Sequence, residues 1–162
     1  ERLRQHPCIA LWCGNNENEE GWNNWGWQKE LKYTIDDSAT VWNMYASIFR
    51  QMIPAVLSEF DPSRPYWPSS PSIGWGRPES MKSGDSHYWG VWWGKEPFEI
   101  YKVKTGRFMS EYGFQALPSM ATWQGIAGTP NLDISMPAVK MHQKHPTGFE
   151  TIQHYLQQSE VQ

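Results

Sequence analysis

Residues 8–13, CIALWC, form a short continuous apolar run that ends at Gly14. A run of this length, without alternation of polar and apolar residues, is typical of a strand buried on both faces, as parallel strands are. Cys8 and Cys13 lie five positions apart on this expected strand, so their side chains point to opposite faces and no disulfide between them is expected. The run therefore favours a parallel α/β fold.

A long helical pattern follows in residues 36–62. Ser38 is the expected N-cap of this helix. Apolar side chains recur beyond it at helical spacing: they are Trp42, Tyr45, Phe49, Met52, Ile53, Val56 and Phe60. Pro54 has no backbone N–H to donate, so we expect it to kink the helix or to end its first half.

The rest of the chain alternates in the same way. We expect a turn, a short strand and a loop in residues 61–71, a loop in 69–86, a strand end in 87–93, a short helix in 96–105, a strand in 106–115 and a closing helix in 148–158. Strands that alternate with helices indicate a parallel α/β fold. Four strand units fall short of a full (β/α)8 barrel, which needs about 250 residues.

Polar and aromatic residues gather where the expected strands end. They are Asn16 and Glu17, Tyr66 and Trp67, His87 to Trp89, and Glu111 and Tyr112. A (β/α) barrel places its active site at the carboxyl ends of its strands. The pattern therefore predicts a site at that edge of the sheet.

Aromatic residues are unusually frequent, since eleven Trp, seven Tyr and six Phe make up 15% of the chain. A buried indole N–H needs a hydrogen-bond partner, so tryptophan is costly as mere filler. Two interpretations remain open. The aromatic residues build either an unusually large core or a cleft whose flat faces stack on sugar rings.

Composition excludes several other classes of protein. The 162 residues are enough for one globular domain, 39% of them are apolar and the net charge is −3. Lys and Arg are scattered without a basic stripe, so no nucleic-acid partner is expected. No apolar run approaches the roughly 20 residues that span a bilayer, and no membrane role is expected. The sequence opens without Met and without the apolar stretch of a signal peptide, so we expect a piece of a longer chain. Its cellular compartment is left undetermined by the sequence.

Two glutamates, Glu17 in WCGNNE and Glu111 in FMSEYG, stand out at expected strand ends. Glycoside hydrolysis needs one carboxylic acid to protonate the leaving oxygen and a second carboxylate to attack the anomeric carbon or to activate water. A lone glutamate at a strand end is more often a solvated surface group. One sugar-cleaving site, however, would explain Asn16 before Glu17, the many tryptophans and a glutamate inside an apolar strand together.

The remaining titratable residues give weaker signals. The five histidines form no recognisable metal set, and HQKH at residues 142–145 is a poor zinc motif, so no metal is expected. Glu19 and Glu20 compete with Glu17 for the role of acid, and we interpret them as loop charges or supporting groups. The serines lack a G-x-S-x-G context and no glycine-rich phosphate loop occurs, so no organic cofactor is expected.

The segment RLRQHPCIALWCGNNENEEGW resembles the part of family 2 glycoside hydrolases in which a strand ends in Asn-Glu, with Trp five residues before the Glu. RPYWPSSP, GDSHYWGVWWGKEPFEIY and RFMSEYGFQALPS follow in order and resemble the β-mannosidase branch. The resemblance spans residues 1 to about 155. It implies a fragment, residues 1–162, of a catalytic (β/α)8 TIM barrel that contains strands four to seven with their helices.

By this resemblance, Glu17 is the general acid/base and Glu111 the nucleophile of a retaining exo-β-mannosidase, which forms a covalent mannosyl-enzyme intermediate. Asn16 matches the family residue that hydrogen-bonds the 2-hydroxyl of the sugar. The substrates implied are β-mannoside oligosaccharides. Related enzymes are periplasmic, secreted or lysosomal, which leaves the compartment open.

Aromatic residues are the candidates for the rest of the sugar site. Trp25, Trp67 and Trp89 are candidate walls of the subsites, and ordinary barrel packing is the alternative for each. Glu111 must stay ionised, which requires a neighbouring hydrogen-bond donor. Tyr88 is the first candidate for that donor and Tyr112 the second.

The implied piece lacks strands one to three and strand eight of the barrel, and this affects what it can do alone. A half-open sheet exposes strand edges and apolar surface, so we expect the piece alone to be inactive and to pair with another copy or with the remaining parts of the full-length enzyme. Two alternatives remain open. One is another family 2 activity, such as β-galactosidase or β-glucuronidase, and the other is a carbohydrate-binding fragment without catalysis.

Overall fold

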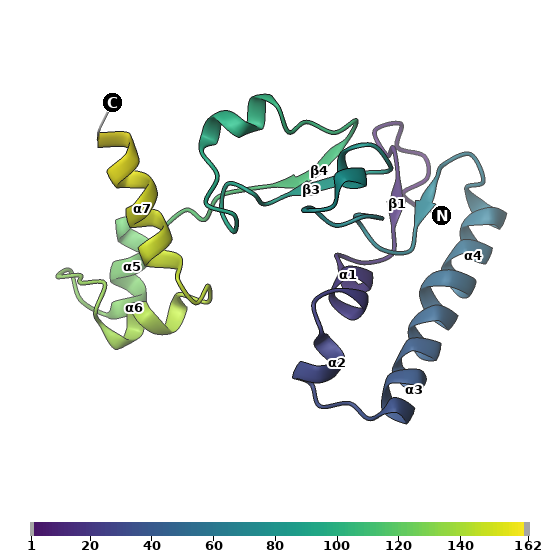
Figure 1. Cartoon of the computed structure of the whole chain (residues 1–162), viewed down its shortest axis with the longest axis horizontal. Helices are drawn as coiled ribbons and strands as arrows, with labels where there is room; N and C mark the ends of the chain where they lie inside the picture. Colours follow the sequence, from purple (N-terminus) through teal and green to yellow (C-terminus); the bar gives the residue numbers. More distant parts are fainter. Residues whose placement is uncertain (1, 161–162) are drawn as a thin grey trace. The chain divides into compact units, whose positions relative to one another are not determined.

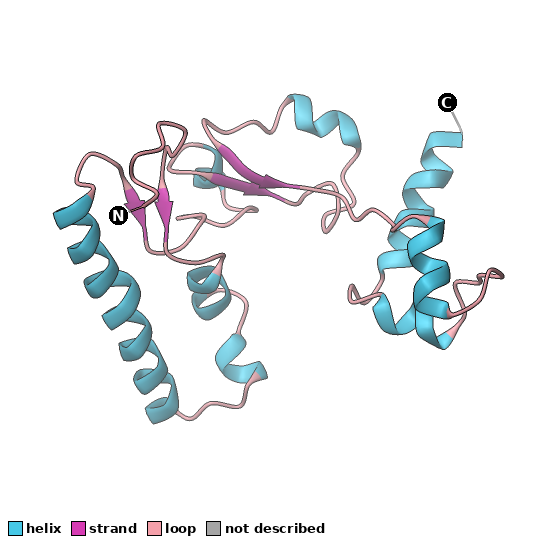
Figure 2. Cartoon of the chain, turned by 180° about the vertical axis from the view of Figure 1, so that it is seen from behind, coloured by secondary structure: helices cyan, strands magenta, loops and turns pink. Residues whose placement is uncertain are grey.

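The computed structural model of the chain describes residues 2–160. These residues form two compact units, of which the first contains residues 2–88 and 98–112 and the second residues 89–97 and 113–160. Figure 1 follows the chain through both units, and Figure 2 shows the same elements by type. Every expected strand and both longer expected helices are present, so the α/β class is confirmed.

The first unit contains four short strands. β1 (Trp12–Cys13) pairs in parallel with β2 (Tyr66–Trp67), and an isolated bridge between Asn16 and Ser70 extends this pairing. β3 (Ser86–Tyr88) pairs in parallel with β4 (Met109–Tyr112). Both pairs are two-stranded sheets. The parallel direction was predicted, whereas one sheet that joins all four strands is not observed among the described residues.

The expectation that the first strand is buried on both faces is wrong. Cys8 and Cys13 are exposed, and only two residues of the apolar run pair as a strand. Because β1 has a single neighbouring strand among the described residues, no second layer covers it. Both cysteines are free thiols, as their spacing predicted.

The predicted helix of residues 36–62 runs from α3 (Ile35–Ala46) through the π-helical segment Ser47–Met52 into α4 (Ile53–Phe60). Its N-cap is Thr34 and not Ser38. Thr34 and Asp37 form a capping box, in which Thr34 Oγ1 accepts from the Asp37 N–H at 3.1 Å and Asp37 Oδ2 accepts from the Thr34 N–H at 3.0 Å. The Asp37 carboxylate accepts hydrogen bonds from the Thr34 hydroxyl at 2.6 Å and from the Thr34 N–H, and both lower the pKa of Asp37.

Pro54 interrupts this helix without ending it. It lies in the first turn of α4, directly after the π-helical segment. A proline ring clashes with the carbonyl four residues earlier and cannot donate to it, and a wider π turn relieves both problems. The helix therefore continues past Pro54, and the structure shows a change of helix type before the proline instead of an end of the first half.

Asp61 joins the end of α4 to β1. Its carboxylate is buried and accepts hydrogen bonds from the Trp12 indole at 2.9 Å and from Arg64 at 2.6 Å. The bond from Trp12 and the nearby Arg64 guanidinium hold the pKa of Asp61 below its usual value. Trp12 is thus anchored by the polar end of its ring.

Several short helices were not predicted. They are α1 (Asn18–Asn23) and α2 (Trp27–Glu30) between β1 and α3, and the 3-10 helix η2 (Pro78–Met81) inside the expected loop. The expected helix of residues 96–105 is the 3-10 helix η3 (Phe98–Lys102). Helices this short carry too few residues for a helical period to be visible in the sequence.

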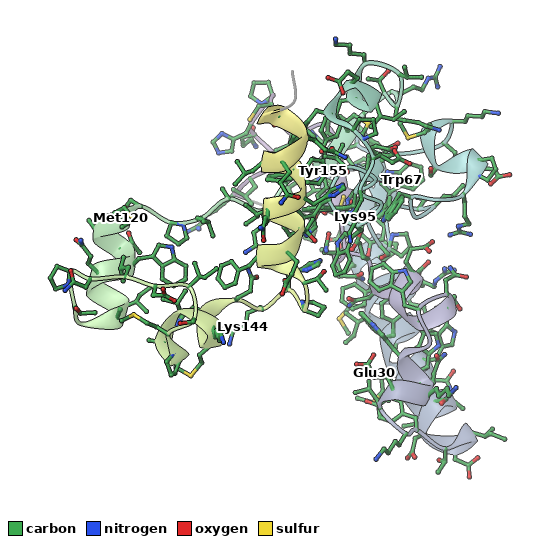
Figure 3. The ribbon with its side chains drawn as sticks, turned by 60° about the vertical axis from the view of Figure 1, so that its left-hand side comes forward. Glu30, Trp67, Lys95, Met120, Lys144 and Tyr155 are labelled. Atoms are coloured by element: carbon green, nitrogen blue, oxygen red, sulfur yellow. The ribbon has the colours of Figure 1, made fainter. Side chains whose placement is uncertain are left out.

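The second unit consists of α5 (Met120–Ala127), α6 (Pro137–His142) and α7 (Gly148–Glu160) with the segment 89–97. The ring of Phe114 packs edge-on against Trp92 and Tyr155, each at 5.0 Å between ring centroids. Tyr155, labelled on α7 in Figure 3, donates its hydroxyl to the carbonyl of Glu96 at 2.7 Å. The closing helix was predicted, and α5 and α6 were not.

None of the helices in residues 2–160 combines the length and the apolar character that crossing a bilayer requires.

Candidate functional site

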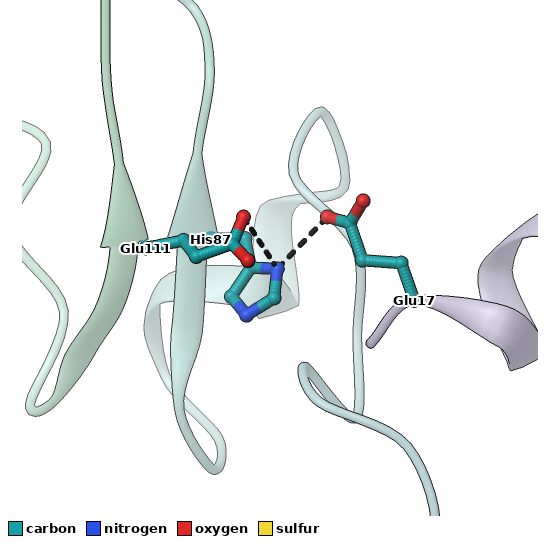
Figure 4. A group of neighbouring side chains, drawn as sticks. All are labelled: Glu17, His87 and Glu111. Atoms are coloured by element: carbon teal, nitrogen blue, oxygen red, sulfur yellow. Dashed lines mark hydrogen bonds and ion pairs between the residues drawn. The ribbon is translucent and has the colours of Figure 1, made fainter. Parts of the chain in front are cut away.

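Three side chains of the first unit converge, as Figure 4 shows. Nδ1 of His87 lies 2.8 Å from Oε1 of Glu17 and 3.4 Å from Oε2 of Glu111. One carboxylate oxygen of Glu17 and one of Glu111 lie within 4.8 Å of each other. The fold thus brings together two glutamates that are 94 positions apart in the sequence.

Each member of the cluster is placed by a strand. Glu17 follows β1 and precedes α1, His87 is the central residue of β3, and Glu111 lies on β4 directly opposite His87 in the parallel register. Because side chains alternate along a strand, this register sets His87 and Glu111 on the same face of the pair. The buried imidazole lies between the two partly exposed carboxylates.

The backbone at Glu17 is left-handed, with φ 55° and ψ 8°, which is uncommon for a residue other than glycine. Two hydrogen bonds hold it there. The Glu17 N–H donates to the Ser70 carbonyl at 2.8 Å, and the Ser70 N–H donates to the Asn15 carbonyl at 2.9 Å. Such conformations persist where surrounding contacts impose them, and they concentrate at functional sites.

A buried polar group lies behind the imidazole. Nε2 of His87 lies 3.0 Å from the Ser70 hydroxyl, which in turn hydrogen-bonds Oδ2 of Asp85. The Ser110 hydroxyl donates to the same oxygen at 2.6 Å. Asp85 and His87 are each only 1% exposed. These contacts of His87 and Asp85 were not predicted, and no local signal in the sequence marks them.

The doubled asparagine divides into two roles. Asn15 is structural, because its Nδ2 donates to the Pro68 carbonyl at 2.8 Å and its Oδ1 accepts from the Ser69 hydroxyl at 2.9 Å. Asn16 is exposed beside Glu17 and bridges Ser70 through its backbone. Its side chain is therefore accessible to a ligand, as a sugar contact would require.

The aromatic candidates differ in exposure. Trp25 is 50% exposed, Trp67 on β2 is partly buried, and Tyr88 is 4% exposed, with its ring packed edge-on against Tyr101. Trp67 is labelled in Figure 3. Trp89 belongs to the second unit. The roles of these four residues as subsite walls or as a hydrogen-bond donor stay predictions.

Glu19 and Glu20 are occupied by other partners. Glu19 pairs with Arg50 at 2.8 Å and accepts from the Tyr45 hydroxyl at 3.1 Å. Burial raises the pKa of Tyr45 to about 12. Glu20 is buried and accepts from the Gly74 N–H at 3.0 Å and from Arg77. Both carboxylates therefore join α1 to neighbouring segments.

We expect the two neighbouring glutamates to differ strongly in their effect on stability. Glu20→Ala should lower the free energy of unfolding by about 2–3 kcal/mol, because it leaves the buried Gly74 N–H without an acceptor. Glu19→Ala is the matched control and should cost less than about 1 kcal/mol, because its partner Arg50 is 49% exposed and Glu19 itself 20%, so water weakens the pair. Denaturant-induced unfolding of both variants measures the difference. Equal losses would contradict the structural role of Glu20.

One imidazole and two carboxylates also provide the donor atoms that divalent cations use. Here Glu17 and His87 are in direct hydrogen-bond contact at 2.8 Å, so these two atoms satisfy each other without an ion. The cluster can exchange protons and can present two carboxylates to one ligand. This chemistry does not demand a metal.

No protein-family model matches the chain. It is 36% identical over 130 residues to a β-mannosidase B of Neosartorya fischeri, which corresponds to 75% of this chain and 15% of that protein. The β-mannosidase B of Thermothelomyces thermophilus is 34% identical over 127 residues, or 75% of this chain and 14% of that protein.

A solved structure gives the same result. The crystal structure of a β-D-mannosidase from Dictyoglomus thermophilum superposes with a TM-score of 0.66 at 35% identity, over 95% of this chain and 18% of that one. The chain is homologous to part of the β-mannosidases. The family resemblance drawn from the motifs is thereby confirmed, and the chain spans about 14–18% of the length of the relatives named here.

Proposed function

We propose that this chain carries the two catalytic carboxylates of a retaining glycoside hydrolase that removes terminal β-linked mannose. The observation that carries the proposal is the distance of at most 4.8 Å between carboxylate oxygens of Glu17 and Glu111. Retaining enzymes hold their carboxyl groups about 5–5.5 Å apart, whereas inverting enzymes separate them by about 6.5–9.5 Å. The homology to β-mannosidases is the reason for proposing mannose as the sugar.

In this mechanism Glu111 attacks the anomeric carbon and forms a mannosyl ester, while Glu17 protonates the departing oxygen. Glu17 then takes a proton from the water that hydrolyses the ester, and the product keeps the β configuration. Asn16, exposed beside Glu17, donates to the 2-hydroxyl of the sugar. That contact strengthens as the transition state acquires oxocarbenium character.

The proposed setting is part of a (β/α)8 barrel, with β1, β2, β3 and β4 as strands four to seven. Two observations support it. Both strand pairs are parallel, and Glu17, His87 and Glu111 lie on or after strands, near the end where such barrels bind substrate. Because the chain covers only 14–18% of the relatives named above, the activity is proposed for the complete gene product. We expect residues 1–162 alone to be inactive.

The direct test is a panel of four nitrophenyl glycosides, the β-mannoside, β-galactoside, β-glucoside and β-glucuronide, offered to the complete gene product. Release of nitrophenol from the mannoside alone is expected. Proton NMR of the first product should show β-mannose before it mutarotates. Preference for another of the four glycosides would contradict mannose as the proposed sugar. Release of α-mannose as the first product would overturn the retaining mechanism.

A further inference from the structure

Asp85 lies directly before β3, and no Lys or Arg of the described residues pairs with its carboxylate. Oδ2 accepts from the hydroxyls of Ser70 and Ser110, while Oδ1 has no hydrogen-bond partner among the described residues. A buried carboxylate costs free energy unless a partner offsets it. Within residues 2–160 the one ionisable group of opposite sign within 4 Å is the His87 imidazole, whose Nε2 lies 3.9 Å from Oδ2. An interaction that orients the His87 imidazole would explain why a carboxylate is buried at position 85.

The hydroxyl of Ser70 connects the two groups. Its oxygen lies 3.0 Å from Nε2 of His87 and also contacts Oδ2 of Asp85. A hydroxyl has one hydrogen to donate, and an anionic carboxylate is a stronger acceptor than a neutral ring nitrogen. Ser70 therefore donates to Asp85, and its oxygen is left to accept from Nε2. This contact requires a hydrogen on Nε2.

The other ring nitrogen is then committed to Glu17. In a neutral imidazole with its hydrogen on Nε2, the lone pair is on Nδ1. Nδ1 lies 2.8 Å from Oε1 of Glu17, so one proton must lie between these atoms, either on the Glu17 carboxyl or on an imidazolium. Glu111 also faces Nδ1, at 3.4 Å. The thiol of Cys13 on β1 also contacts Ser70 and lies near Asp85. Although the residue as a whole is exposed, desolvation of its sulfur raises the pKa, so it remains neutral.

We propose that Asp85 and Ser70 are positioning residues that keep the hydrogen on Nε2 of His87 and so reserve Nδ1 for the proton of Glu17. The consequence for catalysis rests on the proposed function. A general acid must keep its proton until the leaving oxygen takes it, and Nδ1 as an acceptor stabilises the protonated carboxyl. A hydrogen on Nδ1 with a bare Nε2 would instead stabilise the Glu17 carboxylate and weaken the acid.

Asp85→Asn tests the contacts from Asp85 through Ser70 to His87, because it keeps the size of the side chain at position 85. The neutral amide is a weaker acceptor than the carboxylate, so Ser70 is no longer held to residue 85, donates to Nε2 instead, and the hydrogen moves to Nδ1. For an alkyl β-mannoside, whose leaving group needs protonation, we expect kcat/KM to fall on the order of 10²-fold or more, by the logic of the equivalent change in serine proteases. The alkaline limb of its pH profile should move down by about one unit. For dinitrophenyl β-mannoside, whose leaving group needs no general acid, kcat/KM should fall only slightly.

Two further variants separate positioning from packing. Ser70→Ala breaks the link to His87 and should shift the profile in the same direction. Ser110→Ala is the matched control, because it removes the other hydroxyl on Asp85 and leaves the link intact, so the profile should keep its shape. Equal losses on both substrates with an unmoved alkaline limb, in Asp85→Asn and Ser70→Ala alike, would overturn the proposal.

Nitrogen NMR of histidine-labelled protein gives a readout that does not depend on activity. The signals of His87 are identified by their loss in His87→Gln. Nε2 should be protonated in the wild type, and the hydrogen should move to Nδ1 in Asp85→Asn. A bare Nε2 in the wild type would overturn the proposal even if mannose is released. The expected tautomer in a protein that cleaves no glycoside would overturn the proposed function and leave the positioning of His87 standing.

Discussion

Glu111→Gln should abolish turnover of nitrophenyl β-mannoside, with kcat lowered on the order of 10⁵-fold or more, as expected when a nucleophile is removed. Glutamine keeps the size of the side chain and can hydrogen-bond a sugar, but its amide cannot form the mannosyl ester. The parallel register with β3 places this side chain opposite His87, so the substitution changes chemistry more than structure. The measurement is nitrophenol release by the complete gene product.

Mannose binding by the same variant, measured by calorimetry, separates catalysis from simple carbohydrate binding. We expect binding to be kept while turnover is lost. Glu99→Gln is the matched control, since Glu99 is an exposed glutamate of η3 in the same unit, and it should retain wild-type rates. If the wild-type protein shows no turnover and Glu111→Gln loses mannose binding, the result would instead favour a carbohydrate-binding role.

Trapping gives a second check on Glu111. A 2-fluoro mannoside with a good leaving group slows both steps because it destabilises the oxocarbenium-like transition state, and the covalent ester should then accumulate. Peptide mass spectrometry should find the added sugar on the peptide that contains Glu111. Label on Glu17 or on no carboxylate would contradict the assigned roles.

Glu17→Gln should have an effect that depends on the leaving group. For an alkyl or sugar leaving group, which needs protonation, we expect the rate to fall about 10²–10⁴-fold, the usual contribution of general acid catalysis. For dinitrophenyl β-mannoside the ester should still form, and its slow hydrolysis should limit the rate because no base activates water. Rates for a series of aryl mannosides that differ in leaving-group pKa measure this dependence.

Azide provides the complementary measurement on Glu17→Gln. As an anion that needs no general base, it should attack the mannosyl ester, restore turnover and yield β-mannosyl azide. Glu30→Gln, at an exposed glutamate of α2, is the control and should not respond to azide. An equal loss for all leaving groups, with no response to azide, would contradict the acid/base role of Glu17.

The order of elements could largely be predicted from the sequence. The strands around residues 12, 66, 87 and 110, the long helix and the closing helix are all present. Apolar runs, helical spacing and prolines are local signals and remain readable without the fold. The N-cap was misassigned because Ser38 and Thr34 are both capping residues, and the reciprocal contact with Asp37 decided between them.

The candidate glutamates could also be found in the sequence, because each ends or occupies a strand in a motif that resembles those of the family. Their neighbours could not. His87 lies 70 positions from Glu17, and Asp85, two residues earlier, looked like an ordinary loop residue. Nothing local distinguishes a histidine that lies between two carboxylates from one that packs in a core.

The sequence by itself thus determined the fold class, the positions of the strands and the two glutamates that carry the proposed chemistry. The tertiary structure alone decided that Glu17 and Glu111 meet around Nδ1 of His87, and that Ser70 and Asp85 face its other nitrogen. The physical reason is that these contacts depend on which strands pair and in which register. Pairing and register are properties of segments far apart in the chain, and a shift of one residue would turn His87 or Glu111 to the opposite face.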